Sequence, residues 1–184
     1  RQTIDIEDVL GRQSVSPKKN LMEINIKDKN VLVTGAGGSI GSELCIQISM
    51  LNPKNIILYE QSEFNLYRVE RSLLELSDLS KFKIHSILGD VCNPTQFEFV
   101  CKTYKVETIF HAAAYKHVPL IEKNIIEGFQ NNVYGTLNCL EVAIKNNVKR
   151  FVLISTDKAV RPTNFMGATK RVAEMIVQAL DQKF

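Results

Sequence analysis

Short runs of apolar residues alternate along the chain with longer segments in which apolar positions recur every three to four residues. Such runs are typical of strands buried on both faces, and the periodic segments predict amphipathic helices. The predicted strands cover residues 31–33, 56–59, 82–88, 108–110 and 151–154. The predicted helices cover residues 40–51, 64–76, 121–145 and 167–180. A further helix is predicted to begin at Pro94, with Asn93 as its N-terminal cap. This alternation predicts an α/β Rossmann fold, a doubly wound parallel sheet with helices on both faces.

The first 29 residues do not share this pattern. They show weak periodicity and contain Gly11 and Pro17, so we interpret residues 1–29 as a lead-in segment with little core of its own. Residues 30–184 then form one α/β domain, which agrees with the usual size of about 100–200 residues per domain.

Composition narrows the class of protein without naming a function. The chain is 45% hydrophobic and 23% charged, which is ordinary for a globular domain. Its net charge is only +3 and the basic residues are scattered between acidic ones, so we expect no nucleic-acid partner. No run of about 18 apolar residues and no secretory signal occurs. No Cys-x-x-Cys pair or nearby His suggests a metal or a disulfide, so we expect buried, reduced thiols at Cys45, Cys92, Cys101 and Cys139.

A glycine-rich stretch, residues 34–41, joins the first predicted strand to the first predicted helix. At the spacing Gly-x-x-Gly-x-x-Gly, the first glycine permits a tight turn, the second lets the backbone approach a pyrophosphate, and the third lets the helix pack on the strand. The helix N-terminus offers N–H groups and a partial positive charge to phosphates. A tight turn without a ligand is the alternative. The predicted dinucleotide contacts here are Gly35, Gly38, Ser39, Ile40 and Gly41.

Further cofactor contacts are predicted where the next strands end. Glu60 follows the second strand, about twenty positions beyond the glycines, where an acidic side chain binds the adenosine ribose. Its carboxylate would repel a 2′-phosphate, which favours NAD over NADP, although Arg68 on the next helix could soften this preference. A plain surface role for Glu60 is the alternative. The contacts predicted after the third and fourth strands are Asp90 and Val91 at the adenine edge, and Ala112, Ala113 and Ala114.

The segment after the fifth predicted strand carries the most specific pattern, Ser155-Thr156-Asp157-Lys158, followed by Met166-Gly167-Ala168-Thr169-Lys170. Together with residues 4–12, 62–67 and 111–119, it resembles the extended short-chain dehydrogenase/reductase superfamily. The resemblance is closer still to the CapD-type nucleotide-sugar 4,6-dehydratases of polysaccharide biosynthesis, and it runs through nearly the whole chain.

One position departs from the superfamily pattern, Tyr-x-x-x-Lys. Met166 stands at the Tyr position and Lys170 at the Lys position. Methionine cannot carry a proton, so the tyrosinate that usually removes the sugar hydroxyl proton is missing. Larger, membrane-anchored members of the resembled family carry Met at this point and are active dehydratases, so we interpret Met166 as a subfamily marker.

The resemblance implies a three-step reaction on UDP-N-acetylglucosamine: NAD⁺ takes hydride from C4, water is lost across C5–C6, and the hydride returns to C6. It implies that Thr156 hydrogen-bonds the C4 hydroxyl, that Asp157 protonates the departing C6 hydroxyl, and that Lys158 removes the C5 proton. These roles need a protonated Asp157 and a neutral Lys158, and burial must supply both, because adjacent Asp and Lys stabilise each other's charge. A capped turn with a solvated salt bridge is the alternative for these three residues.

The remaining roles also come from the resemblance. Lys170 is implied to bind the nicotinamide ribose, Asn132 to be the superfamily's structural Asn, and Lys116 and His117 to contact the sugar or the nucleotide. The superfamily fold continues into a smaller substrate lobe, which we expect to be absent from this chain. We therefore expect the chain to be a fragment with feeble activity by itself.

Two other functions compete with a UDP-N-acetylglucosamine 4,6-dehydratase. A nucleotide-sugar 4-epimerase would use the same NAD site, but Thr156-Asp157-Lys158 argues against it, since epimerases of the superfamily rely on Ser/Thr and Tyr. A non-catalytic NAD-binding protein is suggested only by the missing Tyr. We further expect a homo-oligomer, a UDP-sugar as the small-molecule partner, and a cytoplasmic domain that belongs to a protein anchored in a bacterial inner membrane.

Overall fold

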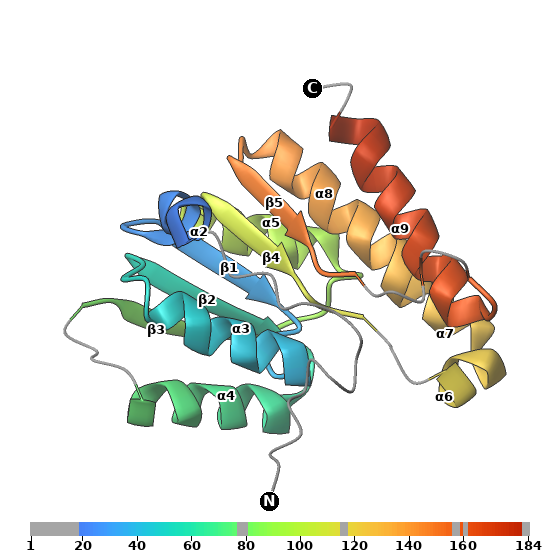
Figure 1. The fold of residues 1–184 in the computed structure, drawn as a ribbon, viewed down its shortest axis with the longest axis horizontal. Helices are drawn as coiled ribbons and strands as arrows, with labels where there is room; N and C mark the ends of the chain where they lie inside the picture. The colour runs from blue at the N-terminus through green and yellow to red at the C-terminus, as the bar shows by residue number, and fades with distance from the viewer. Residues whose placement is uncertain (1–18, 77–80, 115–117, 156–158, 160–161, 182–184) are drawn as a thin grey trace, which may run out of the picture.

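Five parallel strands form one sheet in the computed structural model, which describes residues 19–76, 81–114, 118–155, 159 and 162–181. The strands are β1 (Asn30–Thr34), β2 (Asn55–Glu60), β3 (Lys83–Leu88), β4 (Thr108–His111) and β5 (Arg150–Leu153), in the spatial order β3-β2-β1-β4-β5 (Figure 1). The order turns back at β1, whose Thr34 pairs with Tyr59 of β2 and with His111 of β4. The predicted Rossmann-like fold is confirmed. Sheets of this kind bind ligands beyond the carboxyl ends of the strands, where the order reverses.

Helices cover both faces of the sheet (Figure 1). On one face lie α3 (Ser39–Ser49) and α4 (Glu63–Leu76), and on the other lie α5 (Pro94–Thr103) and α8 (Gly135–Lys145). The last helix, α9 (Phe165–Asp181), packs beside α8. As predicted, α5 begins at a proline behind Asn93, whose side chain accepts a hydrogen bond from Gln96 N.

The two faces are separated residue by residue along the central strands. Side chains alternate across a strand, so Val31 and Val33 of β1 pack with α3 and α4, whereas Leu32 packs with α5 and α8. In β2 the same division places Ile56 and Leu58 on the first face and Ile57 and Tyr59 on the second. Because both faces are covered, every residue of β1 is buried, which explains the uninterrupted apolar run in the sequence.

The expectation that residues 1–29 contribute little core is wrong for the end of that segment. Helix α2 (Lys19–Ile26) packs against the sheet, and Ile26 is 0% exposed within the core on the α3 and α4 face. The Asn25 carbonyl accepts a hydrogen bond from Thr108 Oγ1 at 2.7 Å, and Asn25 Oδ1 accepts one from Arg150 Nε at 3.2 Å. A helix of eight residues has only two turns, too few to show a clear apolar period.

The single helix predicted over residues 121–145 is also wrong. The structure divides it into α6 (Val118–Lys123), α7 (Ile125–Phe129), a π-helical turn η1 (Gln130–Tyr134) and α8. The first break falls at Asn124, which lies outside the helical region at φ −131° and ψ 58°, and whose Nδ2 donates to the Leu120 carbonyl at 2.8 Å. The π turn buries three consecutive residues, Asn131, Asn132 and Val133.

Three features of the part of the chain that the structure describes bear on its function: helix length and hydropathy, metal-binding groups, and cysteines. None of the helices described there is both long and apolar enough to cross a membrane. In that same part of the chain, no group of three or more His, Cys, Asp or Glu side chains is arranged to hold a metal ion. All four cysteines are free thiols; Cys45, Cys101 and Cys139 are buried as expected, but Cys92 is partly exposed.

Candidate cofactor and active site

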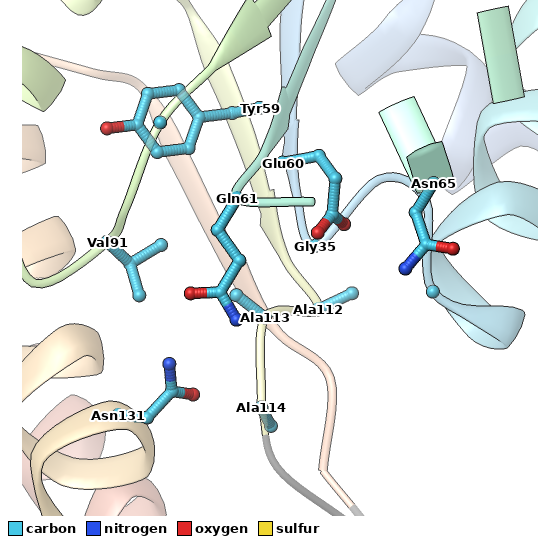
Figure 2. A pocket seen from close by; sticks show the side chains of 12 residues that line it. Gly35, Tyr59, Glu60, Gln61, Asn65, Val91, Ala112, Ala113, Ala114 and Asn131 are labelled. Atoms are coloured by element: carbon cyan, nitrogen blue, oxygen red, sulfur yellow. The ribbon is translucent and has the colours of Figure 1, made fainter. Parts of the chain in front are cut away.

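A crevice runs along the carboxyl edge of the sheet and consists of two adjoining hollows that share Gly38, Ala112 and Ala114. The first, which we call the Glu60 hollow, opens over the ends of β2 and β3 (Figure 2). Its other lining residues are Gly35, Tyr59, Glu60, Gln61, Asn65, Gly89, Val91, Ala113 and Asn131. The second, the Lys170 hollow, lies between the start of α3 and the start of α9, and its other lining residues are Ser39, Ile40, Gly41, Ile154, Ser155, Met166 and Lys170.

The glycine turn lies where the two hollows meet. Gly35 has φ +62°, and a Cβ there would lie 2.6 Å from Ala113 Cα, so this turn needs glycine for both its conformation and its space. A Cβ on Gly41 would lie 2.0 Å from Gly35 O, so only glycine lets α3 begin against the turn. Gly38 is exposed and lines both hollows. The predicted tight glycine turn is therefore present, and the N-terminus of α3 lies at the crevice; phosphate binding there stays a prediction.

Glu60 fixes the turn from the end of β2. Its carboxylate is 7% exposed and accepts two backbone hydrogen bonds, from Gly37 N to Oε2 and from Ser62 N to Oε1, each at 3.0 Å. Figure 2 shows the carboxylate lying close to Gly35. An ionised carboxylate has about four acceptor positions, so acceptor capacity remains on Glu60 for a ligand hydroxyl.

Arg68, which could have changed the preference for NAD, lies outside both hollows. It is exposed on α4, and its guanidinium carbon lies 5.9 Å from the centroid of the Phe64 ring. Asp90 is exposed as well and is not among the lining residues. Its Oδ1 accepts a hydrogen bond from Cys92 N at 2.8 Å, and its carbonyl accepts one from Tyr59 Oη at 3.0 Å.

Asn131 is a site residue that the sequence analysis missed. It comes from the π turn and is 6% exposed, and its Oδ1 is buried without a hydrogen-bond partner among the described residues. Figure 2 shows its amide extending into the Glu60 hollow, opposite Val91 and Gln61. A buried polar atom without a partner is costly, so this amide fits a polar ligand in the hollow. Only the family resemblance pointed to the neighbouring Asn132, and the spacing of apolar residues does not distinguish Asn131 from Asn132.

The Lys170 hollow contains one buried amine among its described lining residues. Lys170 is 5% exposed, and its Nζ makes one hydrogen bond within the described residues, to the Ile154 carbonyl at 3.4 Å. Burial lowers its pKa to about 8, against a smaller raising effect of Glu174. Met166, one helical turn earlier, is 2% exposed and lines the same hollow. Ser155 Oγ is buried there and has no partner among the described residues.

A chain of buried hydrogen bonds crosses from β1 to α8 behind the crevice. Ala113 N donates to Thr34 Oγ1 at 3.3 Å, and Thr34 Oγ1 lies 2.8 Å from His111 Nδ1. On the other side of the ring, Nε2 lies 3.0 Å from Thr136 Oγ1, which itself donates to the Asn132 carbonyl at 2.7 Å. Thr136 therefore accepts from Nε2–H, and Thr34 donates to Nδ1. This arrangement needs a neutral imidazole, and burial together with the charge of Lys170 lowers the pKa of His111 to about 3.

Asn132 continues this chain to α9. Its Nδ2 donates to Thr169 Oγ1 at 3.0 Å, and Thr169 Oγ1 donates to the Met166 carbonyl at 2.7 Å. The network thus joins the strand that leads into the glycine turn to the helix that carries Met166 and Lys170. It gives Asn132 a structural position, in agreement with the role implied by resemblance.

Five predicted site residues lie outside the described residues, namely Thr156, Asp157, Lys158, Lys116 and His117. The structure therefore brings together the glycine turn, Glu60, Val91, the three alanines, Met166 and Lys170. It places only the neighbour of the predicted catalytic segment, Ser155, at the crevice.

Known proteins resemble this chain in sequence and in fold. The model of a family described as "Polysaccharide biosynthesis protein" matches residues 31–184. The capsular polysaccharide biosynthesis protein CapD of Staphylococcus aureus is 44% identical over 97% of this chain and 30% of its own length. A UDP-N-acetylglucosamine 4,6-dehydratase (inverting) of Campylobacter jejuni is 33% identical over 82% of this chain and 43% of its own length.

A solved structure shows the same fold with a cofactor. The UDP-glucose 4-epimerase of Bifidobacterium longum, in complex with NAD⁺ and UDP, superposes with a TM-score of 0.70 and is 26% identical, covering 84% of this chain and 49% of that one. The chain therefore spans less than half the length of each of these relatives.

Proposed function

This chain belongs to the family of polysaccharide biosynthesis proteins, and from that premise we propose that it is the NAD-binding and catalytic part of a UDP-N-acetylglucosamine 4,6-dehydratase. The observation that carries the proposal is the crevice, which continues from Glu60 past the glycine turn to Ser155, Met166 and Lys170. One end suits an adenosine, and the other includes Ser155, which directly precedes in sequence the segment where the resemblance implies catalysis.

The residues of the crevice fit a dinucleotide. The open side of Gly38 and the start of α3 would hold the pyrophosphate, Glu60 would accept the ribose hydroxyls, and the Asn131 amide would gain the partner that Oδ1 lacks. A bound NAD⁺ supplies the hydride acceptor for oxidation at C4. We favour NAD over NADP because the Glu60 carboxylate would repel a 2′-phosphate, and because Arg68 lies over Phe64 rather than in the crevice.

The chemistry after C4 oxidation is assigned to the segment that follows Ser155. Thr156 would hydrogen-bond the C4 hydroxyl, Asp157 would protonate the departing C6 hydroxyl, and Lys158 would take the proton from C5, which the 4-ketone makes acidic. Lys116 and His117 would contact the sugar or the nucleotide. General acid–base catalysis of this kind contributes about 10²- to 10⁴-fold to a rate.

The proposal extends to partners. A UDP-sugar is the substrate, and the product feeds the synthesis of a surface polysaccharide or glycoprotein. Pairing through α8 and α9 would give a homo-oligomer, and we propose that the domain is cytoplasmic and is held at the inner membrane of a bacterium by a part of the protein outside this chain.

The deciding experiment is incubation of the full protein with UDP-N-acetylglucosamine, followed by NMR of the product. A 4-keto-6-deoxy sugar with a new C6 methyl signal is expected. The similarity to the NAD-bound 4-epimerase favours one rival, in which the product would be the C4 epimer with its C6 hydroxyl retained. Recovery of unchanged substrate with each of several UDP-hexoses would contradict both enzymes.

A further inference from the structure

Among its described lining residues, the Lys170 hollow has few groups that can change their protonation state. Among the described residues that line it, the polar side chains are Ser39, Ser155 and Lys170, and the rest are glycine, alanine, isoleucine and methionine. Serine hydroxyls do not ionise near neutral pH. Lys170 is thus the one titratable side chain among the described lining residues of this hollow.

Oxidation of a sugar alcohol releases a proton as well as a hydride. The superfamily gives that proton to the tyrosine that Met166 replaces here, and methionine cannot accept it. Among the described residues, His111 is another base that interacts electrostatically with Lys170, but Thr34 and Thr136 occupy both of its ring nitrogens and it does not line the hollow.

We propose that Lys170 itself accepts the proton of the C4 hydroxyl, in place of the missing tyrosine. The inference rests on the proposed function, because it needs an oxidised nicotinamide and a sugar hydroxyl in the Lys170 hollow. Its structural basis is a buried amine on the wall of that hollow, held by a single contact of 3.4 Å and accompanied by no carboxylate within 4.0 Å among the described residues.

The step balances in atoms and electrons. The C4–H bond breaks and its electron pair leaves with the hydrogen to the nicotinamide, which is reduced. The O–H bond breaks, its electron pair forms the carbonyl bond, and the proton goes to the lone pair of Lys170 Nζ. Over the full cycle Lys170 gains one proton, and Asp157 gives one proton to the departing hydroxyl. Exchange with solvent returns both side chains to their starting states, and one water is lost.

The charges in the hollow favour this transfer. A positive nicotinamide ring bound in this hollow would disfavour a second positive charge and so favour the neutral amine of Lys170. The ring would lose its charge on accepting hydride, and Lys170 would gain one positive charge with the proton. The total charge of the buried site is unchanged, which avoids the cost of creating a new charge away from water.

The surroundings keep Lys170 ready for this role. Burial lowers its pKa to about 8, so some of the amine is already neutral at physiological pH and more becomes neutral as the pH rises. Glu174 on α9 raises the pKa of Lys170, and Lys170 in turn lowers the pKa of His111 on β4. Glu174 is held by Arg171 at 3.0 Å. The hydrogen bonds from Asn132 to Thr169 and from Thr169 to the Met166 carbonyl fix the turn of α9 that precedes Lys170.

The first test uses Lys170→Arg, which keeps the positive charge but cannot lose its proton near neutral pH. In the full protein loaded with NAD⁺ and mixed with UDP-N-acetylglucosamine, NADH formation is followed at 340 nm from pH 6.5 to 9.5. The wild-type rate should rise through a pKa near 8, whereas the variant should lose at least about 100-fold and show no such rise. Its affinity for NAD⁺ should stay within about fivefold. Lys102→Arg, at an exposed lysine paired with Glu98, is the matched control.

A variant that keeps the wild-type rate within threefold and keeps its pH profile would overturn the proposal. Should Lys170→Arg fail to fold, the wild-type protein decides by NMR of ¹³Cε-labelled lysines, which needs no substrate. One lysine should titrate near or below 8 with NAD⁺ bound and at least one unit higher with NADH, and it should remain in Lys158→Met. If every lysine titrates above about 9.5 in both complexes, Lys170 is not the acceptor. Because the NMR result does not depend on which sugar is the substrate, it is separable from failure of the dehydratase proposal.

Discussion

The two hollows of the crevice hold their charged groups in opposite ways. In the Glu60 hollow the carboxylate accepts two backbone hydrogen bonds at 3.0 Å, both from N–H groups of the loops it joins. In the Lys170 hollow the amine has one hydrogen bond within the described residues, a weak one at 3.4 Å, and Ser155 Oγ has no partner among them. Both groups are buried, so the difference lies in their partners rather than in their exposure.

This difference matches two tasks. Two backbone N–H groups hold the Glu60 carboxylate in one position, as a binding group requires. A buried amine with few partners is free to lose and regain a proton, as a group in the chemical step should be. Under the proposed function, binding in this crevice would depend on strand ends and backbone amides, and the chemical step on a buried side chain with few hydrogen-bond partners.

The largest effect is expected from the segment that directly follows Ser155. Lys158→Ala should lower the rate of product formation by about 10²- to 10⁴-fold, because it removes the proposed base for the C5 proton. NAD⁺ affinity, which depends on the other hollow, should change less than twofold. Product formation and calorimetric NAD⁺ binding measure the two effects. Lys149→Ala, at an exposed position, is the control. An unchanged rate would favour the non-catalytic alternative.

A smaller effect, on NAD⁺ binding rather than on the rate, is expected from a change in the Glu60 hollow. Glu60→Gln should weaken NAD⁺ binding by about 10- to 100-fold, since a hydrogen bond to a charged group contributes about 1.5–3 kcal/mol. The rate at saturating NAD⁺ should change less than threefold, and the preference for NAD over NADP should shrink with the loss of the negative charge. Binding titrations with both dinucleotides measure this.

The matched control is Glu63→Gln, at the exposed first turn of α4. Equal NAD⁺ affinities for Glu60→Gln and the wild type would mean that Glu60 only supports the glycine turn. A fall in rate at saturating NAD⁺ as large as the fall in affinity would remove the distinction between the two hollows.

The fold was predictable because its signals are local. The apolar runs at residues 31–33 and 56–59, and the glycines at 35, 38 and 41, determine strands and a turn through their immediate neighbours in the chain. The same holds for Glu60, whose place follows from the end of its strand. Lys170 was identified by its spacing from Met166, although neither its burial nor its few partners could be deduced from that spacing.

Asn131 shows what local signals miss. Its place in the crevice depends on the π turn η1, which adds one residue to a helical turn and so rotates Asn131 and Asn132 inward together. The spacing of apolar residues cannot reveal one added residue in a segment where short helices follow each other closely. The hydrogen bond from Asn132 to Thr169 likewise joins positions 37 residues apart, a distance that no sequence period covers.

The smallest effect, on folding stability, is expected from the hydrogen-bond network through His111 that joins the two hollows. The unfolded chain binds a proton on His111 near pH 6.5, whereas the folded chain holds the pKa at about 3. Because the unfolded state binds more protons between these values, the stabilisation is complete above about pH 6.5 and is lost as the pH falls towards 3, by at most about 1.4 kcal/mol per pH unit. His111→Gln cannot be protonated but keeps a donor and an acceptor. Its free energy of unfolding, from urea titrations at pH 7.5, 6.0 and 5.0, should start lower by about 1–3 kcal/mol and then fall less steeply than that of the wild type.

His85→Gln, at a partly buried strand position beside Asn55, is the control and should keep most of the wild-type slope. Identical slopes for His111→Gln and the wild type would mean that His111 can take up a proton in the folded state, and the turn and α9 would then not be joined through a neutral imidazole.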